Sequence, residues 1–174
     1  IKSSAASDVY KRQVWGDADR GYFPVVDTPW GPMGSLICWE SYMPLARTAL
    51  YEKGVTLYIS PNTNDNSEWQ ATVQHIALEG RCYFINCDMV FHRADYPAGL
   101  HCPEELARLS DIPCRGGSCI VDPYGHYVVQ PVWDREDILY ADLDMHLVPA
   151  SRMELDVCGH YARPDVLRLT VQDV

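Results

Sequence analysis

Short apolar runs alternate with amphipathic stretches through the middle of this chain, and this alternation limits its fold more than any other feature. Residues 35–38, 55–60 and 83–91 are apolar enough to be strands. Residues 44–54 and 68–81 carry apolar residues at helical spacing. Strands that alternate with helices are typical of an α/β layer structure, in which the helices pack on a sheet. The order therefore predicts an α/β fold.

The flanking segments extend this pattern at both ends. Residues 23–27 are predicted to form a hairpin with residues 35–38, joined by the turn-rich residues 28–34. Residues 93–113 have no clear period and are predicted to be a long surface loop. Further strands are expected at 118–122, 127–130 and 138–143, and a last helix at 147–154. No internal repeat or linker interrupts the chain, so we expect one domain.

Composition and charge exclude several classes of protein. The chain has 174 residues, of which 47% are hydrophobic, and its net charge is -10. Only 14 Lys and Arg residues are scattered among 24 acidic ones, which argues against nucleic acid as a partner. No apolar run approaches the ~20 residues of a membrane helix, and no signal peptide is visible. We therefore expect a cytoplasmic protein that has no membrane partner.

Seven cysteines raise the alternatives of a disulfide framework and a metal site. The number is odd and no C-x-x-C pair occurs, so neither alternative is favoured. The spacing of His101, Cys102 and Cys114 matches no zinc pattern. We expect no metal and no cofactor. Four cysteines lie in or beside apolar runs and are predicted to be small core residues: Cys82, Cys87, Cys119 and Cys158.

Cys38 has the sequence context of a nucleophile. It stands where a short apolar run ends in Cys-Trp-Glu and Pro44 opens an amphipathic stretch. A thiol at a strand-to-helix turn is exposed at the end of a sheet. The partial positive charge at a helix N-terminus also stabilises a thiolate. The alternative is a buried thiol at a strand end, with a packing role.

Four further residues are candidates for the site, each with a structural alternative. Glu40, two residues beyond Cys38, is expected to orient the turn rather than act as a second acid. His75 could form a dyad with a cysteine, but a hydrogen-bonded structural histidine on a helix is commoner. Asn62 and Thr63 follow the carboxyl end of a strand, where open α/β sheets bind ligands. Turn chemistry alone would also explain their composition.

Several segments together resemble the nitrilase superfamily, and nitrilases proper within it. The similarity covers the chain from about Val14 to the C-terminus. The Cys-Trp-Glu context combined with His-Tyr-Ala-Arg-Pro-Asp makes it specific. The matching segments are residues 34–47, 69–82, 115–118, 122–125, 141–144 and 159–165.

This resemblance implies a four-layer αββα sandwich and a hydrolase. A Cys38 thiolate would attack a small-molecule nitrile and form a thioimidate, which water would convert to a carboxylic acid and ammonia. The backbone N–H of Trp39 would help to stabilise the developing charge. Homodimers or larger homo-oligomers are also implied. Tyr42, Leu45 and Trp69 are candidates for their interface.

The N-terminal segment departs from the family pattern. Family members carry a Glu base, a Lys and a supporting Glu upstream of the nucleophile. In an ungapped register the Lys would fall at Ser4 and the supporting Glu at Lys11, with the base before residue 1. We therefore expect residues 1–13 to be a non-homologous, artefactual leader, and residues 14–174 to be the C-terminal part of one nitrilase domain. The sandwich would be incomplete at its N-terminus.

Three functions stay open from the sequence. The first is a nitrilase, which the segments at 115–118 and 159–165 favour over an amidase. The second is amide hydrolysis, or hydration of cyanide or a nitrile, on the same scaffold. The third is an inactive fragment that lacks the catalytic Glu and Lys.

Overall fold

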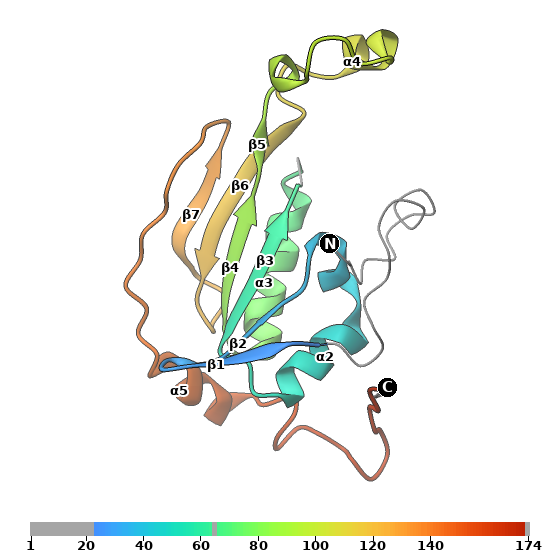
Figure 1. Cartoon of the computed structure of the whole chain (residues 1–174). Coiled ribbons are helices and arrows are strands. Elements are labelled where there is room, and N and C mark those ends of the chain that lie inside the picture. Colours follow the sequence, from blue (N-terminus) through green and yellow to red (C-terminus); the bar gives the residue numbers. More distant parts are fainter. Residues whose placement is uncertain (1–22, 64–65, 173–174) are drawn as a thin grey trace.

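The computed structural model describes residues 23–63 and 66–172, and at its centre lies one mixed sheet (Figure 1). Its strands are β1 (Val25–Thr28), β2 (Gly31–Ser35), β3 (Leu57–Asn62), β4 (Tyr83–Asp88), β5 (Val90–Phe91), β6 (Cys114–Val121) and β7 (Tyr127–Trp133). They lie in the order β1-β2-β3-β4-β6, and β5 and β7 both pair with β6. β2, β3 and β4 are parallel, so their carboxyl ends meet at one edge of the sheet. The other pairs are antiparallel.

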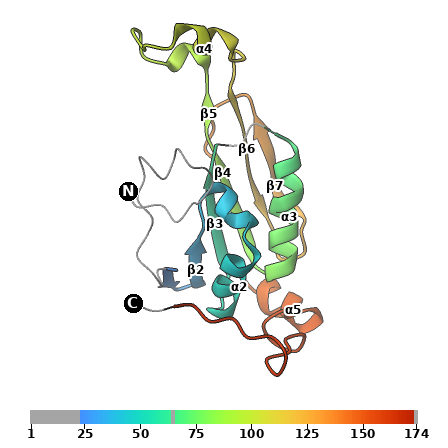
Figure 2. The same ribbon diagram turned by 90° about the vertical axis from the view of Figure 1, so that its right-hand side faces the viewer.

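Two helices connect the parallel strands and cover one face of the sheet (Figure 2). α2 (Pro44–Glu52) lies between β2 and β3, and α3 (Glu68–Gly80) lies between β3 and β4. A 3-10 helix, η1 (Cys38–Tyr42), precedes α2. Parallel neighbours require such crossover connections, so the alternation of strands and helices in the sequence predicts this arrangement. The prediction of an α/β fold is confirmed.

The main core lies between these helices and the sheet. Tyr58 of β3 and Phe84 of β4 stack with ring centroids 4.8 Å apart and an interplanar angle of 18°. Three side chains of α3 pack against the same cluster and are almost fully buried: Trp69, Val73 and Ile76. Each large apolar side chain that is buried contributes about 1.5 to 3 kcal/mol. The cluster therefore fixes α3 against β3 and β4.

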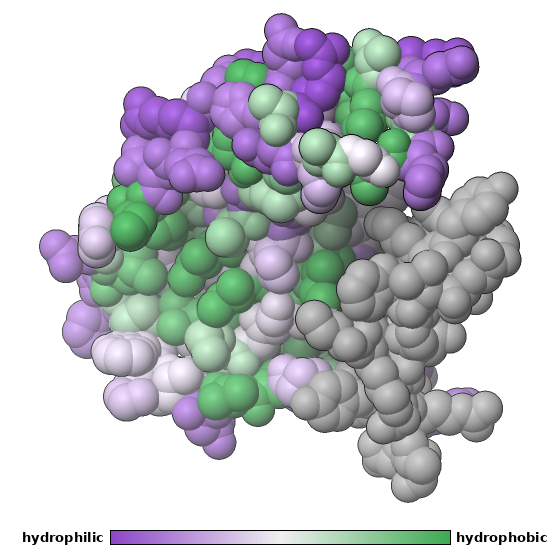
Figure 3. All heavy atoms as spheres, turned by 45° about the horizontal axis from the view of Figure 1, so that its top comes forward, coloured by the Kyte–Doolittle hydropathy of each residue, from purple (hydrophilic) through white to green (hydrophobic). Residues whose placement is uncertain are grey.

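The opposite face of the sheet carries a smaller apolar cluster. Leu57 and Tyr83 are buried there with Val148 of α5 (Leu147–Glu154), which lies at one end of this face. The Tyr83 hydroxyl donates to the backbone oxygen of Asp144 at 2.9 Å. Figure 3 looks onto this face, and hydrophobic residues gather across it. In the described part of the chain this face has no helical layer like that of α2 and α3.

An arm projects from the sheet where a surface loop was expected. It contains η2 (Arg93–Asp95) and α4 (Pro103–Arg108), and Figure 1 shows it extending beyond β5 and β6. Arg93 closes its base by donating to the backbone oxygen of Leu109 and to the carboxylate of Asp111. Short helices and polar contacts thus form this segment. Such elements leave no long apolar period in the sequence, which is why the segment was predicted to be a loop.

The structure differs from the sequence prediction at three strands and in one surface assignment. The strand expected at 35–38 lies at Gly31–Ser35 instead, because a tight turn after Thr28 starts β2 earlier. The strand expected at 138–143 is absent from the described residues, where that stretch is extended without a partner strand. The strand expected at 83–91 divides into β4 and β5. Trp69 is only 1% exposed, so its proposed place in a subunit interface is wrong.

No helix among the described residues combines the length and apolar character that crossing a membrane would require.

Arg81, which ends α3, generates a stability prediction. Its backbone is left-handed, with φ 47° and ψ 51°, and its N–H donates to the oxygen of Ala77. A Cβ in this conformation is strained and glycine is not. We predict that Arg81→Gly is about 1 kcal/mol more stable than Arg81→Ala, the reverse of their order inside a helix. Equilibrium unfolding in urea measures the difference. The matched Ala variant removes the same guanidinium, so equal stability would contradict the strain.

Candidate active site

Cys38 occupies a strained turn at the carboxyl edge of the sheet. β2 ends at Ser35, and Cys38 is the first residue of η1. Its φ is 49°, a value that residues with a Cβ rarely adopt. Such a conformation costs on the order of 1 to 3 kcal/mol and is found where surrounding contacts enforce it. The structure thus places the predicted nucleophile at a strand-to-helix turn, with its side chain half-buried.

Glu40 stabilises this turn through reciprocal hydrogen bonds with Ile37. The N–H of Ile37 donates to Oε2 of Glu40 at 2.8 Å, and the N–H of Glu40 donates to the oxygen of Ile37 at 3.0 Å. Glu40 is buried. These contacts enclose Cys38 on both sides in the chain. The orienting role expected for Glu40 stays a prediction.

A partly buried ion pair joins η1 to α2 and α3. Arg47 of α2 donates from Nη1 to the backbone oxygen of Ser41 at 2.8 Å. Its Nε donates to Oε2 of Glu79 in α3 at 2.9 Å. The Tyr51 hydroxyl donates to the same carboxylate oxygen at 2.9 Å. Because Arg47 is only 7% exposed, this pair joins η1, α2 and α3 in a part of the protein with little solvent.

The two charges of this pair stabilise each other. Burial opposes ionisation of Glu79, but the hydrogen bond and the positive charge of Arg47 outweigh it, so the pKa of Glu79 lies below its ordinary value. Burial also opposes the charge of Arg47, yet its contacts with Glu79 raise the pKa of the guanidinium. Both groups are therefore charged across the physiological range.

A chain of buried polar side chains continues from η1 along the carboxyl ends of β3 and β4. Asn62 donates from Nδ2 to Oδ1 of Asn86 at 2.7 Å. Trp69 donates from Nε1 to the same oxygen at 3.0 Å. The Asn86 amide then donates to Oδ2 of Asp88 at 2.7 Å and to the backbone oxygen of Gly117 at 3.0 Å. Asn86 thereby connects α3 with three neighbouring strands.

Asn86 was not among the residues singled out from the sequence. It lies inside an apolar strand, where a lone asparagine is not a signal of function. Its alignment with Ser60 across β3 and β4, and the depth of its burial, follow from strand register. Asn62, which was predicted to line the pocket, has its amide turned into this buried chain. Thr63, the next residue, is exposed.

His75 and Trp39 are exposed, whereas Cys38 is half-buried. The side chain of His75 is 63% exposed, and its Nε2 lies 3.7 Å from Oε1 of Glu79. It thus contacts the Arg47–Glu79 pair. The Trp39 ring is about half exposed and meets Tyr42 edge-on, with centroids 6.4 Å apart.

Of the four cysteines expected in the core, three are buried or half-buried, and Cys87 is exposed. Burial raises the pKa of Cys82 and of Cys119 to about 12, and that of Cys158 to about 11. These three thiols therefore stay protonated at neutral pH and are poor nucleophiles. Cys87 is exposed, so its expected place in the core is wrong. It faces outward because alternate residues of β4 point to the face of the sheet away from α3.

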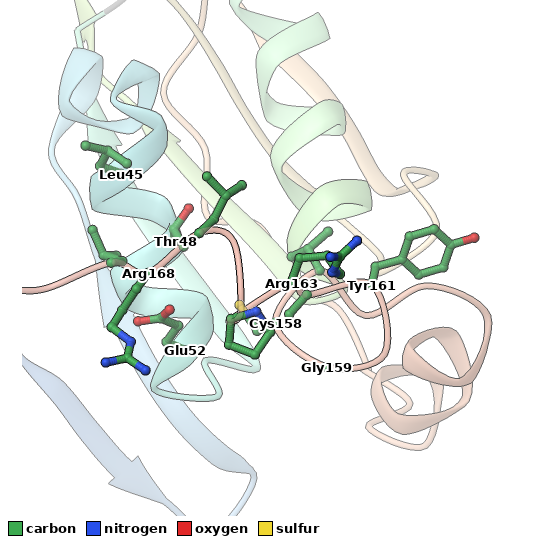
Figure 4. Close-up of a pocket in the computed structure, with 13 residues that line it drawn as sticks. Leu45, Thr48, Glu52, Cys158, Gly159, Tyr161, Arg163 and Arg168 are labelled. Carbon is green, nitrogen blue, oxygen red and sulfur yellow. The ribbon is translucent and has the colours of Figure 1, made fainter.

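A cavity of about 650 Å³ lies apart from this site (Figure 4). It forms between α2, which contributes Leu45, Thr48 and Glu52, and the C-terminal residues 157–169. Neither Cys38 nor Asn62 lines it. Arg163 lies at its wall, and the guanidinium is bound through two hydrogen bonds to Asp165.

Within residues 23–63 and 66–172, no three side chains of His, Cys, Asp or Glu are grouped so that they could hold a metal ion.

Comparison with known proteins relates these features to one family. The family model described as carbon-nitrogen hydrolase matches residues 3–153. Its match begins inside the segment 1–13 that was expected to be a leader; the boundary at residue 14 lies outside the described residues and stays a prediction. An aliphatic nitrilase of Sinorhizobium fredii (strain HH103) is 46% identical over 167 residues, which are 94% of this chain and 53% of that protein.

Plant proteins match over the same extent. A bifunctional nitrilase/nitrile hydratase of Nicotiana tabacum is 41% identical over 169 residues, 94% of this chain and 48% of that protein. The chain spans about half the length of the relatives it matches.

Solved structures share the fold at low sequence identity. The NitFhit protein of C. elegans has a TM-score of 0.74 and 22% identity, over 99% of this chain and 39% of that one. A carbon-nitrogen hydrolase from Helicobacter pylori G27 has a TM-score of 0.71 and 21% identity, over 94% and 57%. The α/β fold of the nitrilase type is thereby confirmed. The described residues supply one sheet and the helix layer on it.

The Arg47–Glu79 pair predicts how stability depends on pH. The folded pKa of Glu79 is depressed, so its contribution is complete above the unfolded value of 4.5 and is lost as pH falls through the folded value. Glu79→Gln should cost about 2 kcal/mol at neutral pH, less than a fully buried pair because Glu79 is partly exposed. That cost should shrink as pH falls from neutral to well below 4.5 and the Glu79 carboxylate becomes protonated.

Urea unfolding of both proteins across this range measures the effect. Asp137→Asn is the matched control, because it removes a carboxylate from the exposed pair with Arg135 and should change stability by less than about 1 kcal/mol. A cost of Glu79→Gln that does not vary with pH would contradict the ionic origin of the contact.

Proposed function

The chain belongs to the carbon–nitrogen hydrolase family, and we propose that it is the C-terminal part of a nitrilase with Cys38 as nucleophile. The observation that carries this proposal is the strained turn at Cys38, held by Glu40 at the carboxyl edge of three parallel strands. An aliphatic nitrilase and nitrilase/nitrile hydratases are among the relatives of this chain, which supports a small-molecule nitrile as substrate.

The proposed reaction proceeds through a covalent thioimidate. The Cys38 thiolate attacks the nitrile carbon, and a proton is added to the nitrogen to give an S-bound imidate. Water adds to its carbon, the C–N bond breaks and ammonia leaves, so that a thioester remains. A second water cleaves the thioester, releases the carboxylic acid and restores the thiol. The backbone N–H of Trp39 supports the developing negative charge in these steps.

The neighbouring residues have supporting roles in this proposal. Glu40 orients the turn, and Asn62 and Thr63 border the pocket, with His75 a more distant candidate. The resemblance places a Glu base and a Lys upstream of Cys38. The position of the Lys corresponds to Ser4, that of the supporting Glu to Lys11, and that of the Glu base falls before residue 1. Ser4 and Lys11 lie outside the described residues. Cytoplasmic location likewise stays a prediction from the sequence.

Release of an amide is the second candidate outcome. It requires only that the tetrahedral adduct of water expel the Cys38 thiolate instead of ammonia, which leaves R–CO–NH₂. The Nicotiana tabacum relative, a bifunctional nitrilase/nitrile hydratase, supports this second route. The ratio of ammonia to amide distinguishes the two routes on the same protein.

We predict that this chain alone releases no ammonia from nitriles, because the proposed base and cation are not supplied at the expected positions. A hybrid should be active if the segment of the Sinorhizobium fredii relative that precedes its match to residue 14 of this chain is joined ahead of residue 14. In that hybrid Cys38→Ala should reduce turnover more than about 1000-fold.

Ammonia and amide assays on several nitriles measure this prediction, and Cys87→Ala is the control that removes an exposed thiol elsewhere on the sheet. Retention of a few per cent of turnover after Cys38→Ala would exclude Cys38 as the nucleophile. Cysteine-dependent turnover by the short chain would instead refute the need for upstream groups.

We further propose that the hybrid forms a homodimer or a larger homo-oligomer. Tyr42, Met43 and Leu45 are large, exposed and contiguous at the start of α2, as expected of an interface. Leu45→Glu should shift the hybrid toward monomer, and light scattering at micromolar concentration measures the mass. Leu78→Glu, at an exposed position of α3, is the control. A monomeric unsubstituted hybrid would contradict the proposal.

A further inference from the structure

Ser41 is the residue at which η1 is fastened to the rest of the molecule. It is fully buried although its side chain is polar. Its backbone oxygen accepts from Nη1 of Arg47 at 2.8 Å. Its Oγ accepts from the hydroxyl of Tyr58 at 3.0 Å and lies 3.4 Å from Oγ of Ser60. Contacts from α2 and β3 therefore converge on one residue of a short helix.

The geometry of η1 couples Ser41 to Cys38. A 3-10 helix has three residues per turn, so a single turn of backbone joins residues that are three positions apart. Cys38 and Ser41 are separated by three positions in η1. A displacement of Ser41 would therefore move the turn that holds Cys38 at a positive φ. Glu40 constrains the turn locally, whereas Ser41 sets its position relative to the sheet.

The Ser60 hydroxyl connects this turn with Asn62, which we propose borders the substrate pocket. Ser60 lies in β3, and its Oγ accepts from Nδ2 of Asn62 at 3.2 Å. Asn62 is bound in turn to Asn86. Since every link is buried, water cannot easily replace a lost partner, and an orphaned hydroxyl or amide would cost about 1 to 3 kcal/mol. The turn and the pocket residue thus belong to one hydrogen-bonded unit.

We infer that Ser41 is a positioning residue for Cys38, acting through the Tyr58, Ser60 and Arg47 contacts that fix η1 on β3. The inference rests on the proposed function in so far as Cys38 is the nucleophile. It specifies a residue whose side chain does not touch substrate. Replacing its hydroxyl changes the reactivity of Cys38 through the position of the turn.

The test measures the reactivity of Cys38 without requiring turnover. Peptide-resolved mass spectrometry follows alkylation by iodoacetamide between about pH 6 and about pH 10, with exposed Cys87 of the same chain as internal reference. Ser41→Ala should lower the Cys38-to-Cys87 rate ratio about fivefold. Ser110→Ala, the same change at an exposed position of the arm, should leave the ratio unchanged.

Tyr58→Phe provides a second variant that keeps the ring stacked on Phe84. It removes one donor to Ser41 and should lower the ratio about twofold, because Ser60 remains in place. This variant decides the test if Ser41→Ala does not fold. If both variants lower the unfolding midpoint but leave the Cys38-to-Cys87 alkylation rate ratio unchanged, Ser41 only stabilises the fold and the inference is overturned.

The outcome is distinguishable from failure of the proposed function. Altered Cys38 alkylation in a hybrid that releases no ammonia or amide would refute the nitrilase proposal and leave the positioning role intact. Ammonia release that depends on Cys38, together with unchanged alkylation in both variants, would refute the positioning role alone.

Discussion

A cysteine with φ 49° persists only if the contacts around it outweigh the strain, and the architecture at the carboxyl edge of the sheet meets this requirement. Glu40 closes the turn from within, through two hydrogen bonds with Ile37. Arg47 holds the far end of η1 and is itself held by Glu79. The strain is thus distributed over a 3-10 helix, two α-helices and a strand. The Cys38 side chain is thereby held at one position by contacts with regular secondary structure.

Satisfaction of buried polar groups is the second condition at this edge. Asn86 is almost fully buried, and its side chain accepts from Asn62 and Trp69 and donates to Asp88 and Gly117. All its polar atoms are therefore paired, so it adds rigidity without the penalty of an orphaned amide. A network in which every member is satisfied specifies one arrangement of its strands. Here it fixes β3, β4 and β6 relative to α3 immediately beside the proposed site.

The different environments of the thiols follow from the same sheet. Cys82 and Cys119 are buried beneath α3, where burial disfavours the thiolate. Cys38 lies beyond the end of β2, at the opening of a helix. Identical side chains thus differ in exposure according to their positions relative to the core. Burial keeps Cys82 and Cys119 protonated, whereas Cys38 stands at the turn where we propose the nucleophile.

The sequence alone determined the α/β class, the helices at α2, α3 and α5, and the position of Cys38 at a strand-to-helix turn. It could do so because apolar periodicity and residues such as Pro44 act locally along the chain. It misplaced β2 and assigned Trp69 and Cys87 to the wrong environments, because face and depth depend on register with distant strands. Tertiary structure alone decided the hydrogen-bond partners of Ser41, Asn86 and Glu79. They come from segments up to tens of residues apart, and only packing of the helices on the sheet brings their polar atoms within hydrogen-bonding distance.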